Sequence, residues 1–214
     1  SSPRRGGALG GSAGPEAPRV SSPRAALWPA LLAPGRGGYL YVAARDVAAA
    51  AGGGGFSVIG PLGQELLRAC VEREGGATRL SLSPVRLGTA PAVVRPSPQR
   101  GPGSRDGSAG PTGTHAELDI VGPDGKRFGT LAKLRDGAGP HIVRRSGEDL
   151  PAVVVSGEPS ELRLTATAGD GGLMASTARV RGWGGRPEQV EVKAQPGVDT
   201  GLMLACVLSI ILPL

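Results

Sequence analysis

Short apolar runs, many of them alternating with polar residues, recur along the chain from about residue 56 to the C-terminus. Most are bounded by Gly, Pro, Asp or Ser. This spacing predicts β-strands of about 5 to 9 residues joined by tight turns, as in an antiparallel meander. Where the runs alternate, one face of the sheet packs and the other meets water. The predicted strands are 56–59, 77–83, 117–121, 127–134, 141–145, 150–155, 161–167, 173–181 and 189–193.

Two turns carry the clearest hairpin chemistry. Asp124-Gly125 and Asp170-Gly171 supply the positive-φ positions that tight hairpins need. In addition, segment 59–64 (Ile-Gly-Pro-Leu-Gly-Gln) resembles segment 121–126 (Val-Gly-Pro-Asp-Gly-Lys), and each reads as a strand end, a turn and a new strand. A single pair of copies is also compatible with chance, because Gly-Pro turns are common.

One segment keeps a helical alternative. In residues 65–74, Leu66, Leu67, Cys70 and Val71 fall on one face of a helix. The same residues also fit a strand that follows the turn at 60–64.

The C-terminal segment 201–212 is apolar on every side except at Ser209. Asp199 and Thr200 precede it as N-cap candidates, and Pro213 ends it. Twelve helical residues span about 18 Å against about 30 Å of bilayer hydrocarbon, so a membrane crossing is disfavoured. A helix that is apolar all round is enclosed by protein. We therefore expect a mainly β fold, a closed antiparallel β-barrel enclosing this helix; the alternative is a C-terminal membrane anchor.

The sequence divides into two regions. Residues 1–55 contain 12 Gly and 6 Pro but only 8 residues of Leu, Ile, Val and Phe, so we expect disorder there, with at most one short strand at 39–42. The barrel domain is expected at 56–214, with a flexible insertion at 95–113 and the central helix at 201–212. The apolar run at 25–33 also resembles a short signal-peptide core, and the Arg-rich opening resembles a transit peptide.

Composition narrows the function classes. The chain has 24 Lys and Arg against 18 Asp and Glu, and only three of the 24 are Lys. The charge of +6 reflects either compositional drift or attraction to an anionic surface. Aromatics at 3% argue against base stacking and hence a nucleic-acid partner. Two Cys, Cys70 and Cys206, exclude a disulfide scaffold and fit reduced thiols in an intracellular protein.

Catalytic and metal motifs are weak throughout. Segment 10–14 matches Gly-x-Ser-x-Gly, but no strand precedes it and no helix follows it. His115 and His141 lie far from ligand-like Cys or carboxylate spacing. Segment 122–126 lacks the spacing of a phosphate loop. We predict neither catalytic residues nor a metal site.

Several segments resemble the phospholipid scramblase family of the tubby C-terminal-like superfamily. Segment 122–131 is similar to its strand, Pro-x-Gly turn and following strand; segment 141–157 resembles its paired strands. Segment 179–183 resembles its strand with a cation two residues before Trp, segment 199–208 its terminal apolar helix, and segment 63–69 its first hairpin. The resemblance implies a barrel around a buried helix, and lipid movement between bilayer leaflets triggered by calcium.

The sequence departs from that family in two places. Calcium needs about six oxygen ligands, several of them carboxylates. The segment before the terminal helix offers only Glu188, Glu191 and Asp199, and the family's palmitoylated cysteine tract is missing. We therefore expect no cofactor, and calcium only as far as the resemblance implies it.

Basic residues near the predicted turns are the candidate lipid-binding side chains. Arg179 and Arg181 share a strand face with Trp183, where a cation pair beside an indole suits a lipid phosphate. Lys126-Arg127 and Arg144-Arg145 flank turns. The competing interpretation of each pair is an ordinary solvated strand face.

The expected function is a scramblase-like protein that engages anionic phospholipid at the periphery of a membrane. The alternative is a non-catalytic tubby-like module that binds a protein, through the barrel or the N-terminal region, or binds phosphoinositides.

Overall fold

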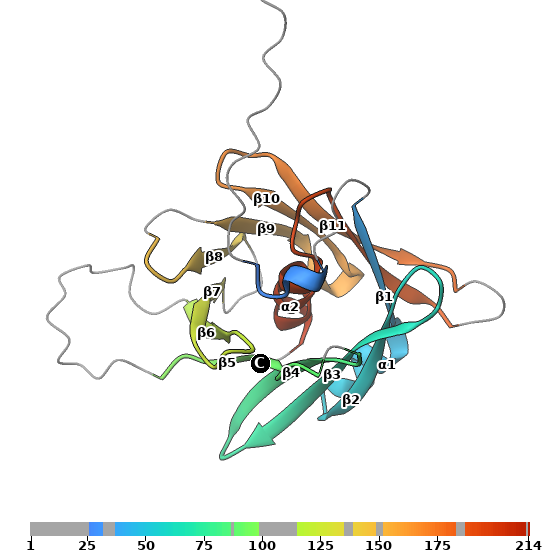
Figure 1. Cartoon of the computed structure of the whole chain (residues 1–214), viewed down its shortest axis with the longest axis horizontal. Coiled ribbons are helices and arrows are strands. Elements are labelled where there is room, and N and C mark those ends of the chain that lie inside the picture. The colour runs from blue at the N-terminus through green and yellow to red at the C-terminus, as the bar shows by residue number, and fades with distance from the viewer. Residues whose placement is uncertain are drawn as a thin grey trace, which may run out of the picture.

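A computed structural model describes residues 26–31, 37–86, 88–98, 115–134, 139–148, 152–182, 187–212 and 214. Within these ranges, twelve antiparallel strands close into a single barrel in which each strand pairs with its neighbours in sequence and β1 pairs with β12 (Figure 1). The strands are β1 Gly38–Ala43, β2 Gly54–Ile59, β3 Glu65–Glu74, β4 Ala77–Pro84, β5 Ala92–Pro96, β6 His115–Val121, β7 Arg127–Leu134, β8 His141–Arg145, β9 Val153–Glu158, β10 Arg163–Ala168, β11 Leu173–Val180 and β12 Gln189–Ala194. The helical elements are η1 Pro29–Leu31, α1 Ala44–Ala50, η2 Pro159–Glu161 and α2 Thr200–Ile211.

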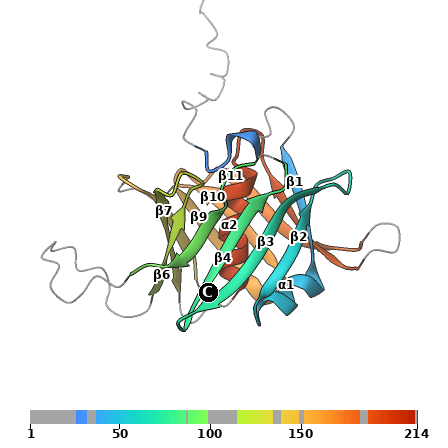
Figure 2. The same cartoon turned by 60° about the horizontal axis from the view of Figure 1, so that its bottom comes forward.

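Helix α2 runs through the middle of the barrel (Figure 2). Every residue from Thr200 to Ile210 is buried; Leu204 is 0% exposed and Val207 3% exposed, and Ile211 is partly buried. Strand residues such as Leu67, with 0% exposure, form the surrounding core. This confirms the mainly β fold class and the enclosed C-terminal helix. The membrane-anchor alternative is wrong for this fold, because the barrel wall covers the apolar surface that an anchor needs.

Local chemistry explains why α2 begins and persists where it does. The Asp199 carboxylate accepts a hydrogen bond from Leu202 N at 2.9 Å and so caps the helix, as its sequence position predicts. Ser209, the one hydroxyl in the apolar stretch, donates to Ala205 O at 2.6 Å. Its buried polar atom is therefore satisfied within the helix.

The expected domain boundary at residue 56 is too late. Residues 38–43 form β1, which pairs along its whole length with β12 and closes the barrel, and α1 follows directly. The Gly-rich composition predicts disorder because it has few apolar residues, but the pairing partner lies about 150 residues away and supplies the missing contacts. The short strand expected at 39–42 is confirmed as part of β1. The expectation of disorder is wrong for residues 44–55, which form α1 and the start of β2, and for residues 26–31, which include η1 and the buried Leu27 and Trp28. Residues 1–25 and 32–36 lie outside the described ranges.

Two further expectations change. Segment 65–74 is strand β3, paired with β2 on one side and β4 on the other, so the helical alternative is wrong. The expected insertion at 95–113 begins inside β5, whose Ala92 and Val94 are buried. Most of that insertion, residues 99–113, lies outside the described ranges.

The resemblance between 59–64 and 121–126 extends to a third copy. In all three turns the same two backbone hydrogen bonds form, and the strand before each turn shifts its register. The turns join β2 to β3, β6 to β7 and β10 to β11, so they recur at every fourth strand. The bonds are Gly60 N–Gln64 O and Gly63 N–Gly60 O, Gly122 N–Lys126 O and Gly125 N–Gly122 O, and Ala168 N–Gly172 O and Gly171 N–Ala168 O, all at 2.8 or 2.9 Å.

The strands alternate in direction, so successive connections lie at opposite ends of the barrel. We call the end at which α2 begins the N-cap end. It carries Asp199, η1 and the connections β2–β3, β4–β5, β6–β7, β8–β9 and β10–β11. We call the other the α1 end; it carries α1, η2 and the last turn of α2. Figure 2 shows α1 at this end of the barrel.

Candidate functional site

Four of the seven predicted site residues come together at the N-cap end. Lys126 ends the β6–β7 turn and Arg127 begins β7, while Arg144 and Arg145 end β8. Strands β7 and β8 are neighbours, with Thr130 opposite Arg144 and Gly129 opposite Arg145. Tertiary structure thus brings two basic pairs, 17 to 19 positions apart in the chain, to one part of the barrel rim.

The other predicted residues do not join this group. Arg179 lies near the end of β11 and Arg181 just after it, at the α1 end. Trp183 lies outside the described residues, so the predicted Arg-Trp arrangement is not described. The seven predicted residues therefore do not form one site.

Arg127 is held by an ion pair within the barrel wall. Its Nε lies 2.9 Å from Asp119 Oδ1, and Nη2 lies 3.7 Å from Glu117 Oε1. Ser97 Oγ donates to the same Asp119 oxygen at 2.9 Å, and Asp119 is only 6% exposed. Because its charge is balanced by a buried carboxylate, Arg127 supports the wall and is poorly placed to bind an anion.

Lys126 and Arg144 differ from Arg127 in this respect. Both side chains are exposed, and neither forms an ion pair with another described residue. Nearby acids are Asp124, whose Oδ1 accepts from Lys126 N at 3.0 Å, and Glu148 in the β8–β9 connection. The cationic head groups of Lys126 and Arg144 are therefore open to a ligand.

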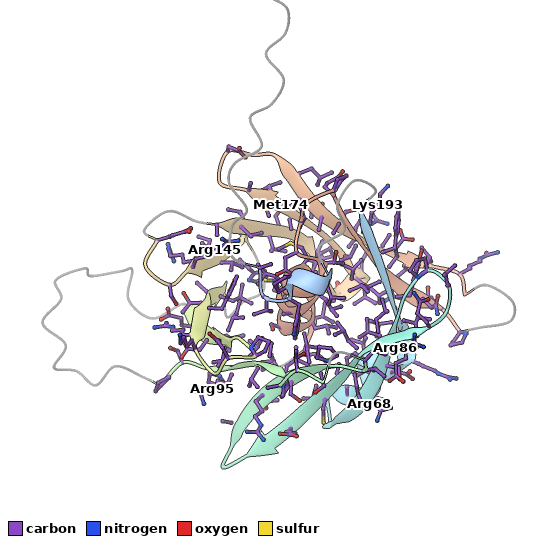
Figure 3. All side chains as sticks on the ribbon, in the orientation of Figure 1. Arg68, Arg86, Arg95, Arg145, Met174 and Lys193 are labelled. Atoms are coloured by element: carbon purple, nitrogen blue, oxygen red, sulfur yellow. The ribbon has the colours of Figure 1, made fainter. Side chains whose placement is uncertain are left out.

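Arg145 is partly buried beside the aromatic ring of Phe128. Its guanidinium carbon lies 5.5 Å from the ring centroid, within cation–π range. Its buried Nε has no hydrogen-bond partner among the described residues. Figure 3 shows Arg145 and Arg86 on different sides of the barrel. Arg145 ends β8 and Arg86 follows β4, and both strands end at the N-cap end. The stacked guanidinium keeps donors that an acceptor oxygen can satisfy.

A second basic group lines an open pocket at the α1 end. It joins the predicted Arg179 to Arg163, and neither Arg163 nor the pocket was predicted from the sequence. Thr177 Oγ1 donates to Leu162 O at 2.7 Å and accepts from Leu164 N at 2.8 Å, so a side chain bridges β10 and β11. Leu162 adopts a left-handed φ of 57°. The pocket has a volume of about 430 Å³ and is lined by Ser160, Glu161, Arg163, Ala178 and Arg179.

The arginines of this pocket already have protein partners. Arg179 Nη1 lies 3.6 Å from Glu188 Oε2, and its Nη2 donates to Ser160 O at 3.3 Å. Arg163 Nη1 lies 3.8 Å from Glu161 Oε2. These exposed pairs are long and weak, so an anion can compete for the guanidinium groups.

At the N-cap end, an N-terminal segment covers the start of α2. Leu27 N and Trp28 N both donate to Asp199 Oδ2, the Trp28 bond at 3.4 Å, and both side chains are buried. Burial raises the pKa of Asp199 above its ordinary value, while the backbone N–H donors of Leu202, Leu27 and Trp28 lower it in part. The run that resembles a signal-peptide core therefore contains the residues that close this end of the barrel.

The carboxylates near the terminal helix do not converge on a cation. Glu188 faces Arg179 at the α1 end, whereas Asp199 lies at the N-cap end beneath Leu27 and Trp28. Within the described ranges, no group of three His, Cys, Asp or Glu residues is placed to hold a metal ion. In the same ranges, no helix combines the length and the hydropathy that a membrane span requires.

Comparison with known proteins gives one informative result. An X-ray structure of a protein from Arabidopsis thaliana is similar to this chain, with a TM-score of 0.57, 15% sequence identity, and coverage of 87% of this chain and 96% of the other. The shared property is the fold. No family model matches the sequence, and no curated protein matches it.

The net positive charge is unevenly distributed over the chain. The described ranges hold 15 of the 24 Lys and Arg residues and 14 of the 18 Asp and Glu residues, a formal charge of +1. The remaining residues carry +5 of the total +6. On the described barrel, the placement of individual cations therefore matters more than the overall charge.

Proposed function

We propose that this protein is a scramblase-like barrel that engages membrane phospholipids through cations at its N-cap end. The observation that carries the proposal is that Lys126, directly before β7, and Arg144 and Arg145, at the end of the neighbouring strand β8, lie at the same end of the barrel. Lys126 and Arg144 are exposed without described ion-pair partners, and Arg145 is fixed by Phe128. Guanidinium and ammonium groups are the side chains that proteins use to bind phosphate oxygens.

The packing of the barrel limits how lipids could move between leaflets. Helix α2 fills the interior, and the residues around it, such as Leu67 and Leu204, are fully buried. An acyl chain has no room to enter without displacing this core. Any lipid movement would therefore involve the outer surface of the barrel, and the proposal needs only surface binding.

Vesicle co-sedimentation of the full chain tests the proposal. We expect binding to phosphatidylcholine vesicles that contain phosphatidylserine, weaker binding without it, and release by salt. Lys126→Gln with Arg144→Gln should weaken binding by up to about 30-fold, because each interfacial cation contributes about 1 kcal/mol.

Arg45→Gln with Arg68→Gln is the matched control. Both arginines are exposed, and the two substitutions remove the same charge from other parts of the surface. Equal loss in both double variants would mean that only the total charge matters. Absence of wild-type binding to anionic vesicles would refute the proposed function.

The pocket at the α1 end favours a second candidate, a non-catalytic module that binds phosphoinositide head groups. Arg163 and Arg179 both line that pocket, and their ion pairs are long. Calorimetric titration of the full chain with inositol 1,4,5-trisphosphate tests this candidate. Binding that is lost in Arg163→Gln with Arg179→Gln, and kept in Lys126→Gln with Arg144→Gln, would support it over the first.

A further inference from the structure

Three large apolar side chains are exposed on the described surface. Leu62 is 90% exposed, Leu173 51% and Val85 46%. Isolated exposed apolar residues are common and need no explanation. Their location is informative, because all three lie in or directly beside connections at the same end of the barrel.

The strand order places them on that end. Leu62 lies in the β2–β3 turn, Val85 follows β4 directly, and Leu173 begins β11 after the β10–β11 turn. All three connections are at the N-cap end (Figure 2). The apolar side chains thus come from three separate hairpins around one rim.

The threefold repeat of the turn shows that turn geometry does not require a leucine at position 62. The equivalent positions in the other two copies are Asp124 and Asp170. There the carboxylate accepts a backbone N–H two residues later, from Lys126 and Gly172, at 3.0 Å. Leu62 cannot accept such a bond. The turn itself therefore favours Asp, and the exposed leucine calls for a reason outside the turn.

Basic side chains lie between the apolar ones along the same rim. Arg86 follows Val85 directly and is exposed. Lys126 and Arg144 occupy the next connections around the barrel, before Leu173 is reached. Among the described residues of the connections at this end, the acidic ones are Asp124, Asp170, Glu148 and the buried Asp199, and the first two direct an oxygen back to their own turns.

Apolar side chains around one rim of the barrel, together with Lys and Arg on the same rim, match the chemistry of a bilayer interface. The apolar groups suit the acyl boundary and the cations suit the phosphate layer. We propose that the N-cap end is the membrane-contacting face, and that Leu62, Val85 and Leu173 insert into a phospholipid surface. This inference rests on the proposed function and adds the orientation of the barrel and an apolar contribution to binding.

A substitution that restores the side-chain acceptor of the other two turns tests membrane insertion without risking the fold. Leu62→Asn should keep or improve folding stability, because Asn can accept the turn bond that Asp124 and Asp170 accept. It should nevertheless lower partition into phosphatidylcholine–phosphatidylserine vesicles about tenfold, and Leu62→Asn with Leu173→Asn about a hundredfold. The control is Ala77→Asn, an exposed position in the β3–β4 hairpin at the α1 end, which should bind like wild type.

Fluorescence at defined sites gives the orientation directly. In a Cys70→Ser background, in which Cys206 stays buried, Leu62→Cys, Leu173→Cys and Ala77→Cys are each labelled with NBD. We expect the emission at positions 62 and 173 to shift to the blue on adding vesicles, and the emission at position 77 to stay unchanged.

The outcomes separate the inference from the function on which it rests. Sedimentation with vesicles, but without an NBD response at 62 and 173 or with a response at 77 alone, overturns the orientation and leaves phospholipid binding in place. No sedimentation at all overturns both. Self-association or protein binding that depends on Leu62, without vesicle binding, would make this face a protein interface and also overturn the inference.

Discussion

The indole ring of Trp28 lies against Gly201, the second residue of α2. A Cβ at position 201 would come within 2.9 Å of Trp28 Cζ3 and closer still to Cε3. The ring is 2% exposed, so it has little freedom to move aside. The glycine is therefore needed for a close approach, and it links the N-terminal segment to the central helix.

We predict that Gly201→Ala weakens this contact. Overpacking of a buried site costs about 1 to 3 kcal/mol, although Ala favours a helix interior by up to about 1 kcal/mol. Urea unfolding should therefore show a net loss of about 1 to 2 kcal/mol, and Trp28 emission should move to longer wavelength. The measurement is made in a Trp183→Phe background, which removes the only other tryptophan. Unchanged Trp28 emission in that background would mean that the ring stays in its buried position and would contradict the prediction.

Asp199 joins the same two segments through one carboxylate. In Asp199→Ala, the N–H groups of Leu202, Leu27 and Trp28 lose their acceptor, so we expect a loss of about 2 to 4 kcal/mol. Asp199→Asn keeps an acceptor and should lose less. Proteolysis of native protein near residue 28 should increase in the Ala variant and much less in the Asn variant.

The pKa of Asp199 predicts the sign of a pH effect. Burial raises this pKa in the folded protein, so the folded state binds its proton more tightly than the unfolded state. The contribution of Asp199 to stability is then greatest below the unfolded pKa and falls as pH rises through the folded pKa. The stability of wild type relative to Asp199→Asn should decline across that window, and a rise would contradict the assignment.

The Thr177 hydroxyl bridges β10 and β11, directly before Ala178, which lines the α1-end pocket. Thr177→Val removes both hydrogen bonds and leaves Leu162 O and Leu164 N without that partner, at a cost of about 1 to 3 kcal/mol. Thr177→Ser keeps the hydroxyl and should stay within about 1 kcal/mol of wild type. Chemical unfolding of the two variants gives the comparison; a larger loss in Thr177→Ser than in Thr177→Val would point to the methyl group instead of the hydroxyl.

The two cysteines should differ sharply in reactivity. Burial raises the pKa of Cys206 to about 12, and its side chain is 1% exposed, whereas Cys70 is half-buried. Because the thiolate is the reactive form, one thiol per chain should react with a disulfide reagent in native protein and two after denaturation. Cys70→Ser should abolish the native reaction; a remaining fast thiol would show that α2 is accessible.

Much of the strand pattern could be predicted from local sequence. Alternation around Leu80, Leu164 and Val192, with Gly and Asp at the turns, marks the buried positions because a strand places every second side chain on one face. Strands β1 and β5 were harder to predict, because Gly38 and Pro96 weaken the local strand signal. Pairing of β1 with β12 and of β5 with β6 stabilises them instead. Segment 65–74 fits two periods, and only its pairing on both edges selects the strand.

The candidate site also combines features that local sequence predicts with contacts that it does not. Adjacent basic residues beside turns were visible in the sequence, and Lys126 and Arg144 are both exposed at the same end of the barrel. The pairing of Arg127 with Asp119 was not visible, because the contact crosses two strands of the sheet. The role of Leu27 and Trp28 was also hidden, since their partner Asp199 is 171 to 172 positions away.

By itself, the sequence determined the C-terminal helix, its cap at Asp199 and its enclosure, because a twelve-residue segment that is apolar apart from Ser209 fits neither water nor a full bilayer. Only the tertiary structure decided where the barrel closes, which end is covered by Trp28, and which cations and leucines share a rim. Those features depend on contacts between residues far apart in the chain, and local propensity carries no information about them.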